Sequence, residues 1–252
     1  MEIVDYKKRW DEKPVLRAVY ADLYRYVEES LVEGNTLEIG SGIGNFKIKQ
    51  GSLIKTDIQF SIDTDVVSDA QSLPFSNESF SNIVLVDVVH HLECPMLFFA
   101  EAQRILKSGG RIIMIDPGIT PLSWFFYKYL HQEPVNMKWN PMEECFIDPQ
   151  KDPYDSNQGM PTLLFGKYLE FFKDKFPSLI LLEHSWMSIF VYQLSGGFQA
   201  WSLIPGRLVN HLLKIERRIQ KKFPFLGGII AFRLKIVLEK KTQYINQVHK
   251  LN

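Results

Sequence analysis

Between residues 35 and 116 the chain alternates short apolar runs with loops and helical stretches, and this pattern constrains the fold more than any other feature. Near-continuous apolar runs are typical of strands that are covered on both faces. Five runs predict strands, at residues 36–39, 53–54, 65–67, 83–86 and 111–115. Strands that alternate with helices indicate βαβ units and a parallel, doubly wound sheet.

Two helices flank these strands. Apolar side chains recur at helical spacing in residues 14–33 and again in residues 96–107, where Ser108-Gly109-Gly110 supplies an end signal. Only 13 residues, 40–52, separate the first two predicted strands. That length is about the minimum for a parallel crossover, so the first crossover helix is expected to be short.

The pattern loosens after residue 116. Residues 119–161 are rich in proline and aromatic side chains and predict an insertion or lid. A helix (162–176), a strand (179–182), a basic amphipathic helix (207–222) and a last strand (228–238) are predicted beyond it.

These predictions describe one domain over residues 1–252. Its expected parts are a helical segment (1–34), a ligand-binding core (35–117), an insertion or lid (118–178) and a C-terminal part with strands and the basic helix (179–252).

The charge distribution is uneven although the formal net charge is zero. Residues 205–252 hold 11 Lys and Arg against 2 Asp and Glu, which gives +9, and the rest of the chain carries −9. The helix at 207–222 can therefore lie on an anionic membrane or bind a lipid-linked acceptor. The alternative is that its apolar face packs inside the fold and its basic face is solvated. We expect no nucleic-acid partner.

The N-terminus mixes charges without an apolar run, and the least charged stretch, 185–206, contains glutamine, serine, glycine and proline, so neither a signal peptide nor a membrane span is predicted. Cys94 and Cys145 lie far apart, which indicates neither a disulfide framework nor a cysteine zinc site. The six histidines form no metal motif, so no metal is expected. A cytoplasmic location fits these features.

A glycine loop, residues 38–44 (EIGSGIG), follows the first predicted strand, and its glycines allow a ligand to approach the backbone. A dinucleotide fingerprint requires glycine at position 45, where this chain has Asn45, so a nicotinamide cofactor is disfavoured. Asp57 ends the second predicted strand 17 residues after Gly40. A carboxylate at that place can accept both hydroxyls of a ribose.

Four motifs in order, residues 37–44 (LEIGSGIG), 69–75 (DAQSLPF), 83–92 (IVLVDVVHHL) and 101–110 (EAQRILKSGG), resemble the class I S-adenosylmethionine-dependent methyltransferases, type 11 branch. The resemblance covers about residues 35–116. It implies a Rossmann-like sheet of seven strands in the order 3-2-1-4-5-7-6, with the seventh antiparallel and helices on both faces.

The resemblance also implies S-adenosylmethionine as the cofactor and assigns its binding residues. Glu38 and the loop residues Gly40, Ser41, Gly42 and Gly44 would surround its methionine part, and Asp57 would hold its ribose. Asp69 and Ala70 would flank the adenine, and Asp87 would help to complete the pocket.

The acceptor side is predicted from position alone. His90 and His91 follow the fourth predicted strand, where a neutral imidazole can take a proton from an acceptor; the alternative is that they line the pocket. Tyr127, Tyr129 and His131 belong to the aromatic stretch 123–132, which is expected to form an acceptor-binding lid. The alternative there is a helix packed on the core.

The function that these features favour is methyl transfer from S-adenosylmethionine to a small molecule or to a lipid- or carbohydrate-linked acceptor. The alternative is a protein that binds the cofactor without catalysis and serves as a regulatory or partner subunit. The acceptor, the atom methylated and the oligomeric state are left open by the sequence.

Overall fold

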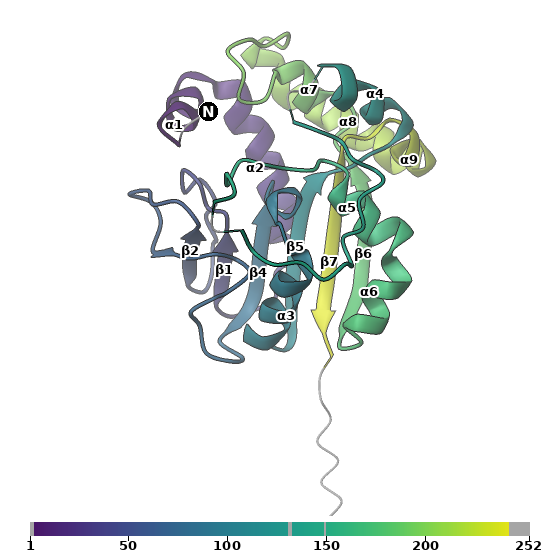
Figure 1. The fold of residues 1–252 in the computed structure, drawn as a ribbon. Coiled ribbons are helices and arrows are strands. Elements are labelled where there is room, and N and C mark those ends of the chain that lie inside the picture. The colour runs from purple at the N-terminus through teal and green to yellow at the C-terminus, as the bar shows by residue number, and fades with distance from the viewer. Residues whose placement is uncertain (1–2, 131–132, 149, 242–252) are drawn as a thin grey trace, which may run out of the picture.

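A computed structural model describes residues 3–130, 133–148 and 150–241. Its centre is one seven-stranded sheet (Figure 1). The strands are β1 (Thr36–Ile39), β2 (Leu53–Asp57), β3 (Val66–Val67), β4 (Phe80–Val86), β5 (Leu106–Pro117), β6 (Leu179–Met187) and β7 (Arg233–Lys240). They lie in the order β3-β2-β1-β4-β5-β7-β6, which confirms the predicted topology.

The sheet is mostly parallel. β1 pairs in parallel with β2 and β4, and β4 pairs in parallel with β5. β7 is antiparallel to both of its neighbours, β5 and β6. The strands β1, β4 and β5 therefore end at one edge of the sheet, where ligands of doubly wound folds bind; this edge is called the carboxyl edge below.

Helices cover both faces of the sheet because successive strand residues point in opposite directions. Ile83 and Leu85 of β4 contact the cluster that includes α3 (Pro95–Ile105) and α6 (Leu169–Lys175). Val84, between them, contacts the cluster formed with α2 (Pro14–Glu28) on the opposite face. The apolar run of β4 is thus buried on both faces, as predicted, whereas β2 and β3 at the edge of the sheet are only partly buried.

The remaining short elements connect these layers or lie at the carboxyl edge. They are α1 (Ile3–Glu12), η1 (Val89–His91), α4 (Pro121–Leu130), α5 (Met160–Thr162), η2 (Leu163–Lys167), α7 (Val191–Ser195), η3 (Gly206–Leu208), α8 (Val209–Lys222), η4 (Pro224–Leu226) and α9 (Gly227–Ile230). Figure 1 shows α1, α4 and α7 beyond the upper ends of β4 and β5. In the described ranges, no helix combines the length and apolar character needed to cross a membrane.

Two local predictions are wrong. The short helix expected between the first two strands does not form, and residues 40–52 follow a loop that Phe46, a fully buried side chain, anchors to the core. The last strand begins at Arg233 rather than at residue 228, because residues 224–230 form η4 and α9. Both differences concern short segments, in which tertiary packing outweighs local sequence preference.

The apolar face of α8 is occupied inside the fold. Val209 and Leu213 pack in a cluster with Val15 and Val19 of α2. Glu216 accepts hydrogen bonds from three backbone N–H groups at the start of α7. The helix thus packs on α2 and α7, and four exposed cationic side chains remain on its outer side: Lys214, Arg218, Lys221 and Lys222.

Cys94 and Cys145 form a disulfide with their Cα atoms 5.8 Å apart. The expectation that the two cysteines do not pair is wrong. The insertion folds back against the start of α3 and brings Cys145 next to Cys94. Because 51 positions separate the two cysteines in the sequence, their distance along the chain gave no sign of this contact. The disulfide links the described residues 133–148 and 150–158 of the insertion, together called the cover segment below, to the region that follows β4.

Candidate functional site

The glycine loop forms a tight turn directly after β1. Gly40 has a φ of +68°, and a side chain there would collide with Val88. Gly42 has a φ of +51°, but a Cβ added there would meet no atom within 4 Å. The turn therefore needs glycine at both positions for its backbone, and it leaves open space only beside Gly42.

Asp57 lies next to this loop at the end of β2. One oxygen of its carboxylate accepts a hydrogen bond from the backbone N–H of Gly42, at 2.8 Å. The other accepts from the N–H of Gln59, at 2.9 Å. Because carboxylate oxygens each accept more than one hydrogen bond, Asp57 can still receive hydroxyl groups from a ligand.

Glu38 is buried in β1 below the loop. Its Oε2 atom and the Oγ atom of Ser41 have no hydrogen-bond partner among the described residues. Burial raises the pKa of Glu38 to about 8. A buried carboxyl oxygen without a hydrogen-bond partner is costly unless a ligand supplies a donor or positive charge, so Glu38 marks a place for such a group.

Three further predicted residues follow β3 and β4, which β2 and β1 separate in the sheet. The carboxylate of Asp69 accepts hydrogen bonds from the backbone N–H and the side chain of Gln71, and Ala70 is buried beside it. Asp87 has a φ of +60° and directs its carboxylate to Arg233 and to the hydroxyl of Tyr20. The side chain of Asp87 is therefore engaged within the protein, while its backbone forms the turn after β4.

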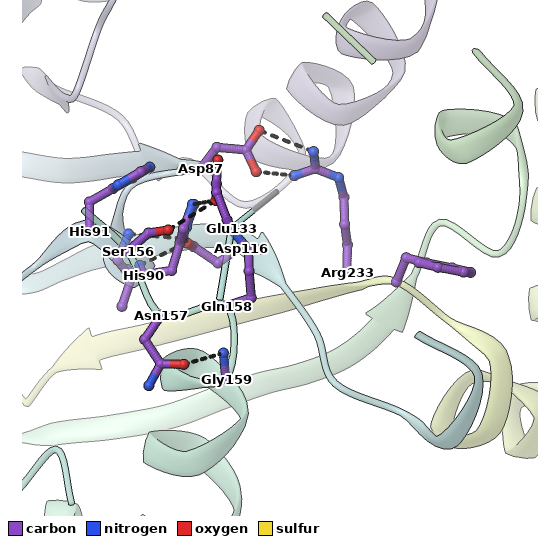
Figure 2. A network of polar contacts seen from close by, with 12 residues as sticks. Asp87, His90, His91, Asp116, Glu133, Ser156, Asn157, Gln158, Gly159 and Arg233 are labelled. Atoms are coloured by element: carbon purple, nitrogen blue, oxygen red, sulfur yellow. Dashed lines mark hydrogen bonds and ion pairs between the residues drawn. The ribbon is translucent and has the colours of Figure 1, made fainter. Parts of the chain in front are cut away.

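His90 lies on η1 between two carboxylates (Figure 2). Its Nδ1 atom is 2.7 Å from Oδ1 of Asp116, and its Nε2 atom is 3.6 Å from Oε2 of Glu133. Burial lowers the pKa of His90, but the two carboxylates outweigh it and raise the value to about 9. Without a ligand, His90 is thus a buried cation at neutral pH.

His91 is next to His90, with the ring centroids 4.1 Å apart. Its Nδ1 atom faces the backbone carbonyl of Asp155 at 3.4 Å. Burial and the charge of His90 lower the pKa of His91 to about 4. His91 is therefore neutral at pH 7, unlike its neighbour.

The cover segment lies over these histidines. The backbone N–H of Asn157 donates to the carbonyl of His90, and Lys151 Nζ donates to the carbonyl of His91, each at 2.8 Å. Tyr154 donates to Gln59 at 3.0 Å and stacks on Tyr6 of α1, with ring centroids 6.3 Å apart. Residues 133–158 and α1 thus enclose the carboxyl edge near β2 and β4.

The aromatic stretch has a different surrounding. Tyr127 is buried and donates to the carbonyl of Phe232, just before β7. Tyr129 is 59% exposed and contacts Trp124 and Phe125 of its own helix. His131 lies outside the described residues. Tyr127 therefore packs α4 onto the fold, as the alternative predicted, whereas Tyr129 is exposed. The acceptor role of both residues stays a prediction.

Three residues of the site were missed by the sequence reasoning: Asp116, Glu133 and Arg233. Asp116 had a usable signal, since it ends the fifth predicted strand and therefore reaches the same edge as His90. Glu133 and Arg233 lie in segments without a local motif. Only the path of the insertion and the position of β7 bring them to the site.

Comparison with known proteins matches residues 37–114 to the family model of a methyltransferase domain. An uncharacterized protein of Methanocaldococcus jannaschii, MJ1123, is 29% identical over 118 residues, which are 44% of this chain and 56% of the relative. The chain thus covers little more than half the length of that relative.

Solved structures share the fold. A SAM-dependent methyltransferase from Archaeoglobus fulgidus is 16% identical with a TM-score of 0.48, over 88% of this chain and 93% of the other. The [4+2]-cyclase SpnF is 15% identical with a TM-score of 0.50, over 88% of this chain and 81% of the other. Such similarity to solved structures concerns the fold and not the reaction. The matched residues 37–114 contain the glycine loop and the strands β1 to β4, so this part of the chain is similar to a methyltransferase domain.

Proposed function

We propose that this chain transfers the methyl group of S-adenosylmethionine to a small-molecule acceptor that reaches the site beneath the cover segment. The observation that carries the proposal is the open space beside Gly42, with Asp57 at its edge and the unpartnered carboxyl of Glu38 below the loop. Open space beside polar groups of this kind suits a ligand that offers both hydrogen-bond donors and positive charge.

The residues present fit the cofactor. Glu38 would receive its ammonium group, and Asp57 would accept its ribose hydroxyls in addition to the N–H of Gly42. Asp69 would accept from the adenine amine, beside the buried Ala70. Gly40, Ser41, Gly42 and Gly44 would provide the close backbone approach.

The bound cofactor supplies a methyl group on a positively charged sulfur. In-line transfer of that group requires little chemistry from the protein beyond alignment of the acceptor and exclusion of water. The cover segment and the contact between Tyr154 and Tyr6 serve the second purpose. His90 and His91 lie on the acceptor side, at the turn that follows β4.

The class of acceptor is inferred from the way the cover segment lies over the site. Hydrogen bonds and the disulfide hold the cover segment against η1 and α3, so a compact acceptor, free or attached to a lipid or carbohydrate tail, fits better than a nucleic acid.

Calorimetric titration with S-adenosylmethionine and S-adenosylhomocysteine tests the cofactor assignment. Gly42→Ala should remain folded by circular dichroism and lose at least tenfold in affinity, because its methyl group fills the open space. Gly166→Ala is the matched control, since a Cβ there also meets nothing within 4 Å but lies in η2. Unchanged binding by Gly42→Ala would remove the assignment.

Transfer of a radiolabelled methyl group to a small-molecule cell extract then separates an enzyme from a catalytically inactive binding subunit. Labelled product that disappears in Gly42→Ala supports the enzyme. Tight cofactor binding with no labelled product in any extract would support the inactive subunit instead.

A further inference from the structure

We propose that His90, His91 and Glu133 form a binding site for a divalent transition-metal ion on the acceptor side of the pocket. The proposal deepens the function proposed above, since the metal would hold the acceptor. One nitrogen of each histidine and one carboxylate oxygen of Glu133 all lie within 4.8 Å of one another (Figure 2). Two histidines and one carboxylate are a common donor set for iron, manganese and zinc.

The distances are close to those that a metal requires. Bonds of about 2.0–2.1 Å to nitrogen or oxygen put two ligand atoms of one ion roughly 3–3.5 Å apart. Nε2 of His90 and Oε2 of Glu133 are already separated by 3.6 Å. Rotation of the His91 side chain within its present surroundings can supply the remaining movement, because the greatest separation in the set is 4.8 Å.

His90 is held as metal-binding histidines usually are. Its Nδ1 atom is bonded to the buried carboxylate of Asp116, which leaves Nε2 directed toward Glu133. Asp116 itself accepts hydrogen bonds from the backbone N–H groups of Val89 and His90. A carboxylate that fixes the far nitrogen of a histidine is the usual outer partner in such sites.

The other two ligands are also oriented. Ser156 donates to Oε2 of Glu133 at 3.1 Å, and the side-chain amide of Gln158 donates to the same oxygen. Nδ1 of His91 faces the carbonyl of Asp155, so Nε2 is the nitrogen that is left for a metal. Asp155, Ser156 and Gln158 all belong to the cover segment, so the position of this segment orients two of the three ligands.

Three protein ligands leave coordination positions open, as in catalytic metal sites. The site lies at the end of β4 and β5, beside the turn at Asp87. A metal there would bind an acceptor through oxygen or nitrogen atoms and lower the pKa of an acceptor hydroxyl, so that its proton is lost to solvent. The resulting oxygen would form a bond to the methyl carbon as the bond from that carbon to sulfur breaks, which leaves S-adenosylhomocysteine. The acceptor class implied is a hydroxylated compound, with a second oxygen able to chelate the ion.

The test is titration of the untagged, full-length chain with Zn²⁺, Mn²⁺ or Co²⁺ alone. We expect one equivalent to bind with a dissociation constant in the micromolar range or below, and Co²⁺ to show visible absorption typical of nitrogen and oxygen ligands. Glu133→Gln and His91→Ala should each weaken binding at least tenfold. Asp116→Asn, which changes a positioning residue, should weaken it about 10–100-fold and alter the Co²⁺ spectrum.

His211→Ala is the matched control, because His211 is an exposed histidine on α8. Absence of binding below millimolar metal, or equal binding in wild type, Glu133→Gln and His91→Ala, would overturn the site. A parallel titration with S-adenosylhomocysteine tests the proposed function independently of the metal site. A chain that binds S-adenosylhomocysteine but no metal retains the proposed function without the metal site, and one that binds metal but not S-adenosylhomocysteine loses the proposed function.

Discussion

Asp87, in the turn after β4, and Arg233, the first residue of β7, form an ion pair across the carboxyl edge of the sheet, with Arg233 buried and Asp87 partly exposed (Figure 2). Arg233 is only 3% exposed, and its guanidinium lies 4.2 Å from the ring centroid of Tyr192. Burial raises the pKa of Asp87, but Arg233 outweighs it and holds the pKa below the ordinary value. The pair fixes the turn that precedes η1 and its two histidines.

We expect Asp87→Asn to destabilise the protein by about 3–5 kcal/mol, because it leaves the Arg233 charge buried without its partner. Asparagine also tolerates the positive φ of this position, so the loss reports the charge. Chemical denaturation of Asp87→Asn, Arg233→Met and the double variant measures the coupling. The double variant should be less destabilised than the sum of the singles; strictly additive losses would contradict the pairing.

We expect Asp57→Ala to weaken binding of S-adenosylhomocysteine by roughly 1.5–3 kcal/mol, which is about 10- to 150-fold, because a charged acceptor is lost. Calorimetric titration gives the value. Asp65→Ala is the control, since Asp65 also accepts a backbone N–H, that of Lys55, but from outside the glycine loop. Equal weakening by both substitutions would show that Asp57 acts only through local structure.

Glu38 should make stability depend on pH. Burial raises its pKa from the ordinary 4.5 to about 8, so the folded state keeps a proton that the unfolded state has lost. Between these two values the stability of the ligand-free protein should fall as pH rises, by at most roughly 1.4 kcal/mol per unit, and this contribution should level off above pH 8.

Denaturation from pH 5 to 9 compares the wild type with Glu38→Gln, whose neutral side chain has no such dependence. The difference in unfolding free energy between the two should change across this range in favour of the variant at high pH. Parallel curves would show that Glu38 does not titrate in this way.

Reduction of the disulfide between Cys94 and Cys145 should lower stability by about 4 kcal/mol, from the entropy of closing a loop of 51 residues. Thermal unfolding with and without dithiothreitol measures it, and a Cys94→Ser and Cys145→Ser double variant should not respond to the reductant. Alkylation and mass spectrometry of protein isolated under air should find no free thiol. Two free thiols per chain and no effect of the reductant would contradict the pairing.

Any contact of α8 with lipid should be electrostatic, because its apolar face is packed against α2 and α7. Sedimentation with anionic vesicles should show binding at low salt that is lost at high salt or with neutral lipid. Reversing Lys214, Arg218 and Lys221 to Glu should weaken it more than 100-fold, at about 1 kcal/mol for each basic side chain near the surface.

The control for that experiment reverses three exposed lysines elsewhere, Lys47, Lys107 and Lys175, with the same change in net charge. Equal losses in the two triple variants would mean that overall charge, and not α8, controls the association. No binding at low salt would remove the lipid surface as a partner.

The sequence by itself determined the parts of this protein that depend on neighbouring residues. Apolar runs predicted the strands, and the sequence placed the glycine loop and Asp57 at the ends of the first two of them. The structure adds that these two strands are adjacent and that Gly42 donates a hydrogen bond to Asp57. The prediction of the strand order depended on the family resemblance as well as on the apolar runs. A strand's period and a turn's glycines are local properties, so they can be read without the rest of the fold.

Only the tertiary structure decided which side chains face each other across the carboxyl edge. His90 meets Glu133, Asp87 meets Arg233, and Cys94 meets Cys145 because the insertion returns over η1 and because β7 enters the sheet between β5 and β6. The paths of long connections depend on packing between distant segments and have no periodic signal in the sequence. The path of the insertion also places His90 between the carboxylates of Asp116 and Glu133. The spacing of the histidines in the sequence did not indicate this arrangement.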